Sequence, residues 1–238
     1  MFCPIPAPLR PYVHLVTLVH ETQNLSAYME HYVRRLGVPL SNIRLFVHRQ
    51  TNSTPDTMLE TRRGAPQTIY TGSYHSNEKR TLVNLHLKTL DADALVMSLD
   101  ADEHAFLPCA GMPPAIALCG TMVDRRDARC ARVRAALGGH DRKIVLARAR
   151  HNGSALQYVS SHSAFFPGIY VRSGLSTCDG RAAIEHLTAT DTAVRLNALK
   201  REVYRNDTTR QRIYARDPTD ERLWKAHSTT CPSAAAAV

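Results

Sequence analysis

The first 48 residues carry a pattern of apolar side chains that few folds can accommodate. Residues 12–19 form a mostly apolar run rich in β-branched residues, typical of a strand buried on both faces of a parallel sheet. The next apolar side chains recur at the spacing of one helix face, at Leu25, Tyr28, Met29, Tyr32, Val33 and Leu36. Gly37 suits the position just past a helix end, and residues 43–48 form a second apolar run. Strand, helix and strand in this order predict the opening of a nucleotide-binding type of α/β fold.

A second helix and strand lead to a cluster of acidic residues. The pattern predicts a helix over 78–90 and a strand over 94–99. The strand is followed at once by Asp100, Asp102 and Glu103. Three carboxylates this close repel one another unless a positive group lies between them. Because open α/β sheets bind ligands at the carboxyl ends of their strands, this cluster is the first candidate site.

The D-x-D spacing favours a divalent cation. Side chains alternate along an extended chain, so Asp100 and Asp102 are expected to project the same way. Mg²⁺ and Mn²⁺ bind through one or two carboxylates together with substrate phosphates. A solvated acidic turn is the alternative. An EF-hand loop is excluded, because no loop starting at Asp91, Asp93 or Asp100 has glycine in sixth place. The two common glycine-rich phosphate motifs are absent from the sequence, so a nucleotide would be held in another way.

The positive charge of the chain is concentrated in its second half. The whole sequence has 30 Lys and Arg against 21 Asp and Glu, a net charge of +9. Residues 1–120 are balanced, so residues 121–238 hold the whole excess. This half predicts a polyanionic partner, a phosphate-bearing substrate or an acidic surface, without choosing among them. Further strands are expected at 113–118 and 143–146, and a last helix at 190–204.

Six widely spaced cysteines form no CxxC pair and no zinc-ligand pattern, and they are expected to be reduced. The prolines near the N-terminus do not suit a signal peptide, and no apolar run approaches the roughly 20 residues that span a bilayer. A soluble cytoplasmic protein is therefore expected. Residues 231–238 are of low complexity and are expected to be disordered.

Three segments in order resemble a known enzyme family. They are LVHETQNLSAYMEHYVRRLGV, FVHRQTNSTPDTMLE and ALVMSLDADEHAFL. They are similar to segments of the GT-A glycosyltransferases of the family 2 and family 92 type, including the compact chlorovirus-encoded enzymes. In that family an N-E pair precedes a helix ending in E-x-x-x-x-x-x-G-V, a D-N-x-S-x-D turn follows the second strand, and D-x-D-E-F follows the fourth. The resemblance covers roughly residues 1–110, and weaker similarity continues in KIVLARA, VSSHSA and IEHLTATDTAVRLNALKR.

The chain departs from the family pattern at several positions. His20 stands where the family usually has Asn, and residues 49–52 are an altered form of the D-N turn. His104 replaces the common Phe, with Phe106 two residues later. These departures bear on the donor sugar and on the nucleotide contacts more than on the fold.

The resemblance implies a GT-A fold with a mostly parallel central sheet flanked by helices. It implies one domain over residues 1–230, in which residues 10–110 bind the nucleotide and residues 111–230 form the acceptor side. The implied activity is transfer of a hexosyl or deoxyhexosyl group from a nucleotide-diphosphate sugar, first of all a UDP sugar, to a glycan or other hydroxyl acceptor. Mn²⁺ or Mg²⁺ is the implied cofactor. The donor sugar, the acceptor and the stereochemistry stay open.

The resemblance also implies roles for single residues. Asp102 would bind the metal ion, and Asp100 would contact the ribose or a metal-bound water. His186 is the candidate for the late histidine that closes on the metal or the diphosphate; its alternative is a packing role beside a helix. The base and ribose pocket would be lined by Thr17, Val19, Glu21 and Asn52.

The resemblance also implies basic residues near the diphosphate and an acidic residue that acts as a base. Lys79, Arg80 and Lys200 are the first candidates to line the diphosphate, and their alternative is a solvated helix charge. An inverting transfer needs a carboxylate base, for which Asp124 and Asp179 are the candidates. Either aspartate could instead be a turn residue or pair with a neighbouring Arg.

Two other classes of function fit parts of the sequence. A basic half and acidic metal ligands would also suit a nucleic-acid-binding protein or a metal-dependent nuclease. Aromatic residues make up only 6% of the chain and are not interleaved with the basic residues, which argues against that alternative, so no nucleic-acid partner is expected. A catalytically inactive binding module with a GT-A fold is the other alternative. The intact Asp100 and Asp102 argue against it, and the changes at His20 and His104 leave it open.

Overall fold

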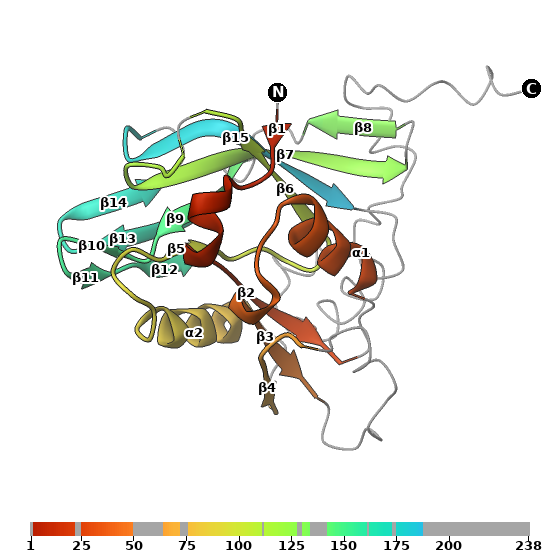
Figure 1. The fold of residues 1–238 in the computed structure, drawn as a ribbon, viewed down its shortest axis with the longest axis horizontal. Coiled ribbons are helices and arrows are strands. Elements are labelled where there is room, and N and C mark those ends of the chain that lie inside the picture. The colour runs from red at the N-terminus through yellow and green to blue at the C-terminus, as the bar shows by residue number, and fades with distance from the viewer. Residues whose placement is uncertain are drawn as a thin grey trace, which may run out of the picture.

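The computed structural model of the chain has an α/β fold built on one large mixed sheet (Figure 1). It describes residues 2–21, 25–49, 64–71, 76–110, 112–127, 130–133, 142–160, 162–172 and 175–187, with the backbone alone at residues 76, 124–127 and 130–133. Within these ranges the sheet has ten strands. Nine follow one another in the order β1 (Phe2–Cys3), β6 (Glu103–Pro108), β15 (Cys178–Leu187), β7 (Ala117–Asp127), β9 (Arg142–Arg148), β5 (Leu95–Met97), β2 (Val13–His20), β3 (Ile43–His48) and β4 (Gln67–Tyr70), and β8 (Cys130–Val133) pairs with β7.

The prediction of a mostly parallel sheet is wrong for one half of it. Strands β5, β2, β3 and β4 are parallel neighbours, and β15 is parallel to β7. Strands β9, β6, β1 and β8 pair antiparallel with their neighbours. Residues 98–102 join β5 to β6, although β15, β7 and β9 lie between these two strands in the sheet. Through these pairings β6 runs opposite to β5, so the sheet is mixed.

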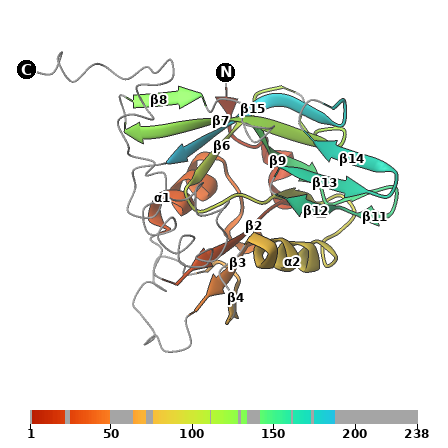
Figure 2. The same cartoon turned by 180° about the vertical axis from the view of Figure 1, so that it is seen from behind.

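The apolar run of β2 is buried because both faces of the sheet are covered. Val13, Leu15 and Val19 belong to one hydrophobic cluster with the residues of α1 (Ser26–Met29), and Val16 and Leu18 belong to a second cluster with α2 (Ser76–Leu87). The two faces of β2 therefore pack against different helices. In both views α1 and α2 lie on different sides of β2 (Figure 1 and Figure 2). Other helices of the described residues are short, so the sheet is less fully flanked by helices than expected.

The predicted amphipathic helix is present, but its second half has wider turns. Segment η2 (Glu30–Arg35) continues α1 as a π-helix, and the Leu36 N–H donates to the carbonyl of His31, five residues earlier. Tyr28 and Tyr32 are buried on the face that the sequence predicted. Gly37 ends the helix with a φ of +82°, a left-handed conformation that glycine adopts without strain.

A small sheet packs with α2 and β2 in one hydrophobic cluster. It is antiparallel and consists of β12 (Gln157–Ser160), β13 (Ser163–Phe166) and β14 (Ile169–Arg172). The Asn84 amide of α2 donates to the carbonyl of Tyr158 (2.9 Å) and accepts from its N–H (2.8 Å). The remaining elements are β10 (Arg150–His151), β11 (Ser154–Ala155) and the short 3-10 segments η1 (Ala7–Tyr12) and η3 (Leu40–Asn42).

Two disulfide bonds correct the prediction that the cysteines are reduced. Cys3 is bonded to Cys109, which fastens β1 to the chain after β6, and Cys119 of β7 is bonded to Cys178 of β15. These pairs could not be predicted from the sequence, because the cysteines of each pair are far apart in the chain and only the pairing of strands brings them together. Cys130 and Cys231 lie outside the residues whose side chains the structure describes.

Some predictions fall outside the described residues. These are the last helix at 190–204, the tail at 231–238, Asn52 and Lys200. Strands from both predicted halves of the chain interleave in one sheet. Within the described ranges, no helix has the length and apolar character needed to cross a membrane.

Candidate functional site

The candidate site lies at one edge of the sheet, where parallel strands end and antiparallel strands begin. Asp100 follows β5, Glu103 opens β6, Lys143 is the second residue of β9, and His186 stands near the end of β15. Because β6 and β9 run against their neighbours, their amino ends meet the carboxyl ends of β5 and β15. The mixed topology therefore gathers residues from distant parts of the sequence at this edge.

The acidic cluster forms a tight turn between β5 and β6. The Glu103 N–H donates to the carbonyl of Asp100 (3.0 Å), and the Asp100 N–H donates to Oε2 of Glu103 (2.8 Å). The turn is thus closed twice, once by the backbone and once by a side chain. The predicted strand over 94–99 is shorter in the structure, Leu95–Met97, and Ser98 and Leu99 continue it as buried chain.

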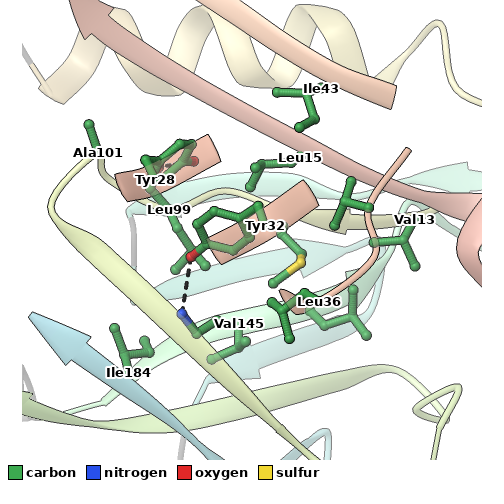
Figure 3. Packing of buried hydrophobic residues seen from close by; sticks show 14 of the residues in the cluster. Val13, Leu15, Tyr28, Tyr32, Leu36, Ile43, Leu99, Ala101, Val145 and Ile184 are labelled. Carbon is green, nitrogen blue, oxygen red and sulfur yellow. Dashed lines mark hydrogen bonds between the residues drawn. The ribbon is translucent and has the colours of Figure 1, made fainter. Parts of the chain in front are cut away.

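Two tyrosines of the amphipathic helix support this turn from the core. The Tyr32 hydroxyl donates to the carbonyl of Glu103 (2.9 Å) and accepts from the Ala105 N–H (3.1 Å). The Tyr28 hydroxyl lies 3.5 Å from the carbonyl of Leu99. Figure 3 shows the two rings side by side in the core, near Leu99 and Leu15. Burial raises the pKa of both phenols well above the usual range, so both stay neutral donors.

Two lysines offset the repulsion among the carboxylates. Lys79 of α2 places its Nζ 2.5 Å from Oδ1 of Asp100. Lys143 of β9 places its Nζ 3.1 Å from Oδ2 of Asp100 and 2.6 Å from Oε2 of Glu103. The Lys143 and Glu103 side chains are only 2% and 3% exposed, whereas that of Asp100 is 34% exposed. Asp100 therefore reaches the surface while its partner Lys143 is enclosed.

The two lysines differ electrostatically. Burial alone would lower the pKa of Lys143, but Asp100 and Glu103 together raise it above the ordinary lysine value. Burial lowers the pKa of Lys79, and the nearby Lys143 charge acts in the same direction, against the effect of Asp100. Lys143 is thus the more firmly charged of the two.

Asp102 has a different partner. Its side chain is 5% exposed, and its Oδ2 lies 3.3 Å from Nε2 of His186. The pairing of β15 with β6 places His186 opposite Glu103, next to Asp102 at the end of the turn. The Leu187 N–H also donates to the carbonyl of Asp102 (2.8 Å). The alternative for His186, capping or packing near a helix, concerns the predicted helix at 190–204, which lies outside the described residues.

His104 and His31 stack beside the turn. Their ring centroids are 4.4 Å apart with 6° between the planes, and the Nε2 of His31 lies 2.7 Å from the carbonyl of Ala105. Burial, followed by the nearby His31 and Arg35, lowers the pKa of His104 to about 4. Burial likewise lowers the pKa of His31. Both rings are therefore neutral at pH 7 and pack as aromatic rings.

The residues predicted to line the nucleotide pocket lie along β2. The side chains of Thr17 and Val19 are fully buried, and Val19 is part of the hydrophobic cluster beneath α1. Glu21 follows β2 at the site edge, where its Oε2 lies 3.5 Å from Nε of Arg49. Their role in nucleotide binding stays a prediction.

The remaining predicted residues divide into near and distant ones. The backbone of Asp124 lies opposite His186 in the register of β7 and β15, at the level of the acidic turn. Asp179 lies seven residues before His186 on β15, roughly 20 Å away at the rise of an extended strand. Its exposed carboxylate accepts from the Arg181 guanidinium, and this hydrogen bond lowers the pKa of Asp179. Pairing with a neighbouring Arg was the alternative for Asp179, and the structure does not bring Asp179 to the turn.

Arg80, predicted to line the diphosphate, donates to the carbonyl of Val159 (2.9 Å).

The fit of a divalent cation rests on two side chains. Among the described residues there is no group of three or more His, Cys, Asp or Glu side chains that could hold a metal ion. The Nζ atoms of Lys79 and Lys143 lie 2.5 Å and 3.1 Å from the carboxylate oxygens of Asp100. The part of Asp100 in metal binding stays a prediction. Asp102 and His186 offer an oxygen and a nitrogen 3.3 Å apart. Two adjacent ligands on an octahedral ion with bonds of about 2.1 Å lie about 3 Å apart, so this pair fits one cation if phosphates and waters supply the other ligands.

Sequence reasoning missed Lys143. Lys143 opens the segment KIVLARA, and a lysine at the head of a largely apolar run is a signal for a buried partner. The pairing itself could not be found from the sequence, because Lys143 lies 40 or more residues from both carboxylates.

No protein-family model matches the chain, and no curated protein matches its sequence.

Proposed function

We propose that the chain is a metal-dependent glycosyltransferase with a GT-A fold, which moves a sugar from a nucleotide-diphosphate donor, first of all a UDP sugar, to a hydroxyl acceptor. The contact between Asp102 and His186 carries the proposal. The resemblance gave these two residues to the metal and diphosphate, and they lie 3.3 Å apart although 84 positions separate them in the sequence.

The charge of the cluster supports a cation at this place. Asp100, Asp102 and Glu103 carry three negative charges, and Lys79 and Lys143 carry two positive ones. In the described structure the two lysines contact Asp100 and Glu103, whereas Asp102 contacts His186. Asp102 and His186 would hold a divalent Mn²⁺ or Mg²⁺ ion, which offsets the charge that develops on a departing nucleoside diphosphate.

The surrounding residues would orient the donor. Asp100 is partly exposed, so one of its oxygens could accept hydrogen bonds from ribose hydroxyls. Lys79 contacts the partly exposed Asp100 and would supply positive charge near the phosphates. Asp124 is the candidate that the register leaves near the site for a general base, which an inverting transfer requires.

The two disulfides bear on the place of action. Disulfides persist in oxidising compartments and are rare in the cytosol. We therefore propose that the protein acts in an oxidising compartment rather than in the cytoplasm.

The test is calorimetric titration of UDP into the folded protein, with Mn²⁺ present and with Mn²⁺ chelated. We expect binding that depends on Mn²⁺ and that weakens at least about tenfold in Asp102→Ala, because the variant removes a ligand of the ion. Asp91→Ala is the matched control, since Asp91 is exposed and belongs to the turn before β5.

Each other outcome points to a defined alternative. Equal UDP binding with and without the metal would contradict a metal-dependent site. Failure of the folded wild type to bind UDP, together with DNA binding that weakens steeply with salt, would favour the nucleic-acid alternative. Metal-dependent UDP binding without turnover of any UDP sugar would favour an inactive GT-A module.

A further inference from the structure

The acidic turn has a buried support that takes no part in the binding described above. We propose that Lys143 is a positioning residue: anchored on Glu103, it holds the turn of residues 100–103 in the form that keeps Asp102 beside His186. This inference rests on the proposed function, because the turn is the part of the site that would meet the metal and the nucleotide.

The first support is the location of the ion pair. Lys143 and Glu103 are 2% and 3% exposed and lie near the amino ends of two different strands of the sheet. A buried ion pair loses the hydration of both charges, so replacing it with apolar residues of similar size often leaves stability unchanged or raises it. Stability alone therefore does not explain why a charged pair is buried here. A role in fixing the geometry of the turn does explain it.

The second support is the pattern of contacts. Oε2 of Glu103 accepts from Lys143 Nζ (2.6 Å) and also from the Asp100 N–H (2.8 Å). The same ammonium donates to Oδ2 of Asp100 (3.1 Å). The buried ammonium group of Lys143 thus contacts both the first and the last residue of the turn. Asp102 lies between these two residues in the sequence.

The third support is the origin of the two lysines. Lys143 stands on β9 in the interior of the sheet, in register with Gly120 of β7. Lys79 stands on α2 and contacts the other carboxylate oxygen of Asp100. The rigid strand fixes the turn from inside the fold, and the helix residue meets it at the partly exposed side.

The single variant Lys143→Met is unsuitable by itself, because it leaves the Glu103 charge buried without its lysine and is expected to unfold the protein. The double variant Lys143→Met with Glu103→Gln removes both charges and keeps an oxygen for the Asp100 N–H. Lys88→Met is the matched control, since it makes the same change at an exposed position just after α2.

We expect the double variant to keep a Tm near that of the wild type and to bind UDP in the presence of Mn²⁺ at least about tenfold more weakly, as losses of supporting residues around metal sites do. A crystal structure of the double variant is expected to show the turn of residues 100–103 displaced from its wild-type position. Lys88→Met is expected to change neither the affinity nor the turn.

The crystal structures separate this inference from the proposed function. An unchanged turn overturns the positioning role, whether or not UDP binding changes. A displaced turn with wild-type UDP binding also overturns it. If the wild type binds no UDP, the proposed function fails, and the position of the turn in the double variant alone decides whether Lys143 holds it. If the double variant does not fold, the smaller change Glu103→Gln, which keeps Lys143, is tested in the same way.

Discussion

His104 packs as a neutral aromatic ring beside the acidic turn. The resembling family usually has Phe here, and the structure stacks the imidazole on His31 at 4.4 Å between centroids. Ring stacking needs a flat neutral group, and burial keeps His104 neutral by lowering its pKa to about 4. The substitution therefore fits the site at neutral pH and makes the helix contact sensitive to acid.

Acid should weaken the fold through His104. Its pKa is about 4 in the folded chain and about 6.5 when unfolded, so between these values the unfolded chain binds the proton more strongly. Stability is thus fully present above pH 6.5 and falls as the pH drops towards 4. Allowing for partial exposure, we expect about 1 kcal/mol from His104 at pH 5, or a Tm about 2–4 °C lower than at pH 7.

The measurement is thermal unfolding of the wild type and His104→Phe between pH 5 and pH 7.5. The Phe variant keeps an aromatic ring and cannot be protonated, so its Tm should fall less on acidification. Parallel Tm curves for the two proteins would show that His104 is not responsible.

At the scale of elements, Gly120 leaves little space between β7 and its neighbours β9 and β15. A Cβ built on Gly120 would lie 2.7 Å from Cγ2 of Val145 and 3.0 Å from Cγ1 of Ile184. These strands carry Lys143 and His186, so their spacing sets the distance between parts of the candidate site.

Gly120→Ala should therefore destabilise the fold. The methyl group meets stiff β-branched side chains, and overpacking of this kind costs about 1–3 kcal/mol, offset in part by the lower chain entropy of alanine. Gly180→Ala in β15 is the control, because its Cβ would meet only the end of the Arg142 side chain at 3.5 Å. Urea denaturation gives both free energies of unfolding, and equal values for the two variants would refute the packing argument.

At the scale of the whole molecule, two disulfides close long loops of the chain. They join residues 106 and 59 positions apart and connect β1 and β15 to the rest of the sheet. Cross-links that close long loops restrict the unfolded chain, so each is expected to contribute about 2–4 kcal/mol.

Mass spectrometry under non-reducing conditions tests this directly. Peptide mapping should recover Cys3 with Cys109 and Cys119 with Cys178, and Cys119→Ala with Cys178→Ala should lower the free energy of unfolding by about 2–4 kcal/mol. Recovery of all four as free thiols from protein produced in an oxidising compartment would contradict the bonds. The same result would remove the argument against a cytoplasmic location.

The strength of local signals explains which elements the sequence predicted. The strand at β2, the helix face of Tyr28 and Tyr32, the end at Gly37 and helix α2 were predicted because side-chain periodicity acts over a few neighbouring residues. The strand directions in the second half were not predicted, because the pairing of a strand depends on which distant strand has an unpaired edge. The prediction of a mostly parallel sheet came from the resemblance and failed there.

The sequence by itself determined the α/β class, the helix that supports the turn, and the acidic cluster after a buried strand, because each is written in contiguous residues. Only the tertiary structure decided the partners of that cluster. Lys143, His186 and the cysteine pairs lie tens of residues from what they contact, and the register of a mixed sheet brings them together. Contacts of this kind depend on the free energy of the whole sheet, which no single stretch of sequence carries.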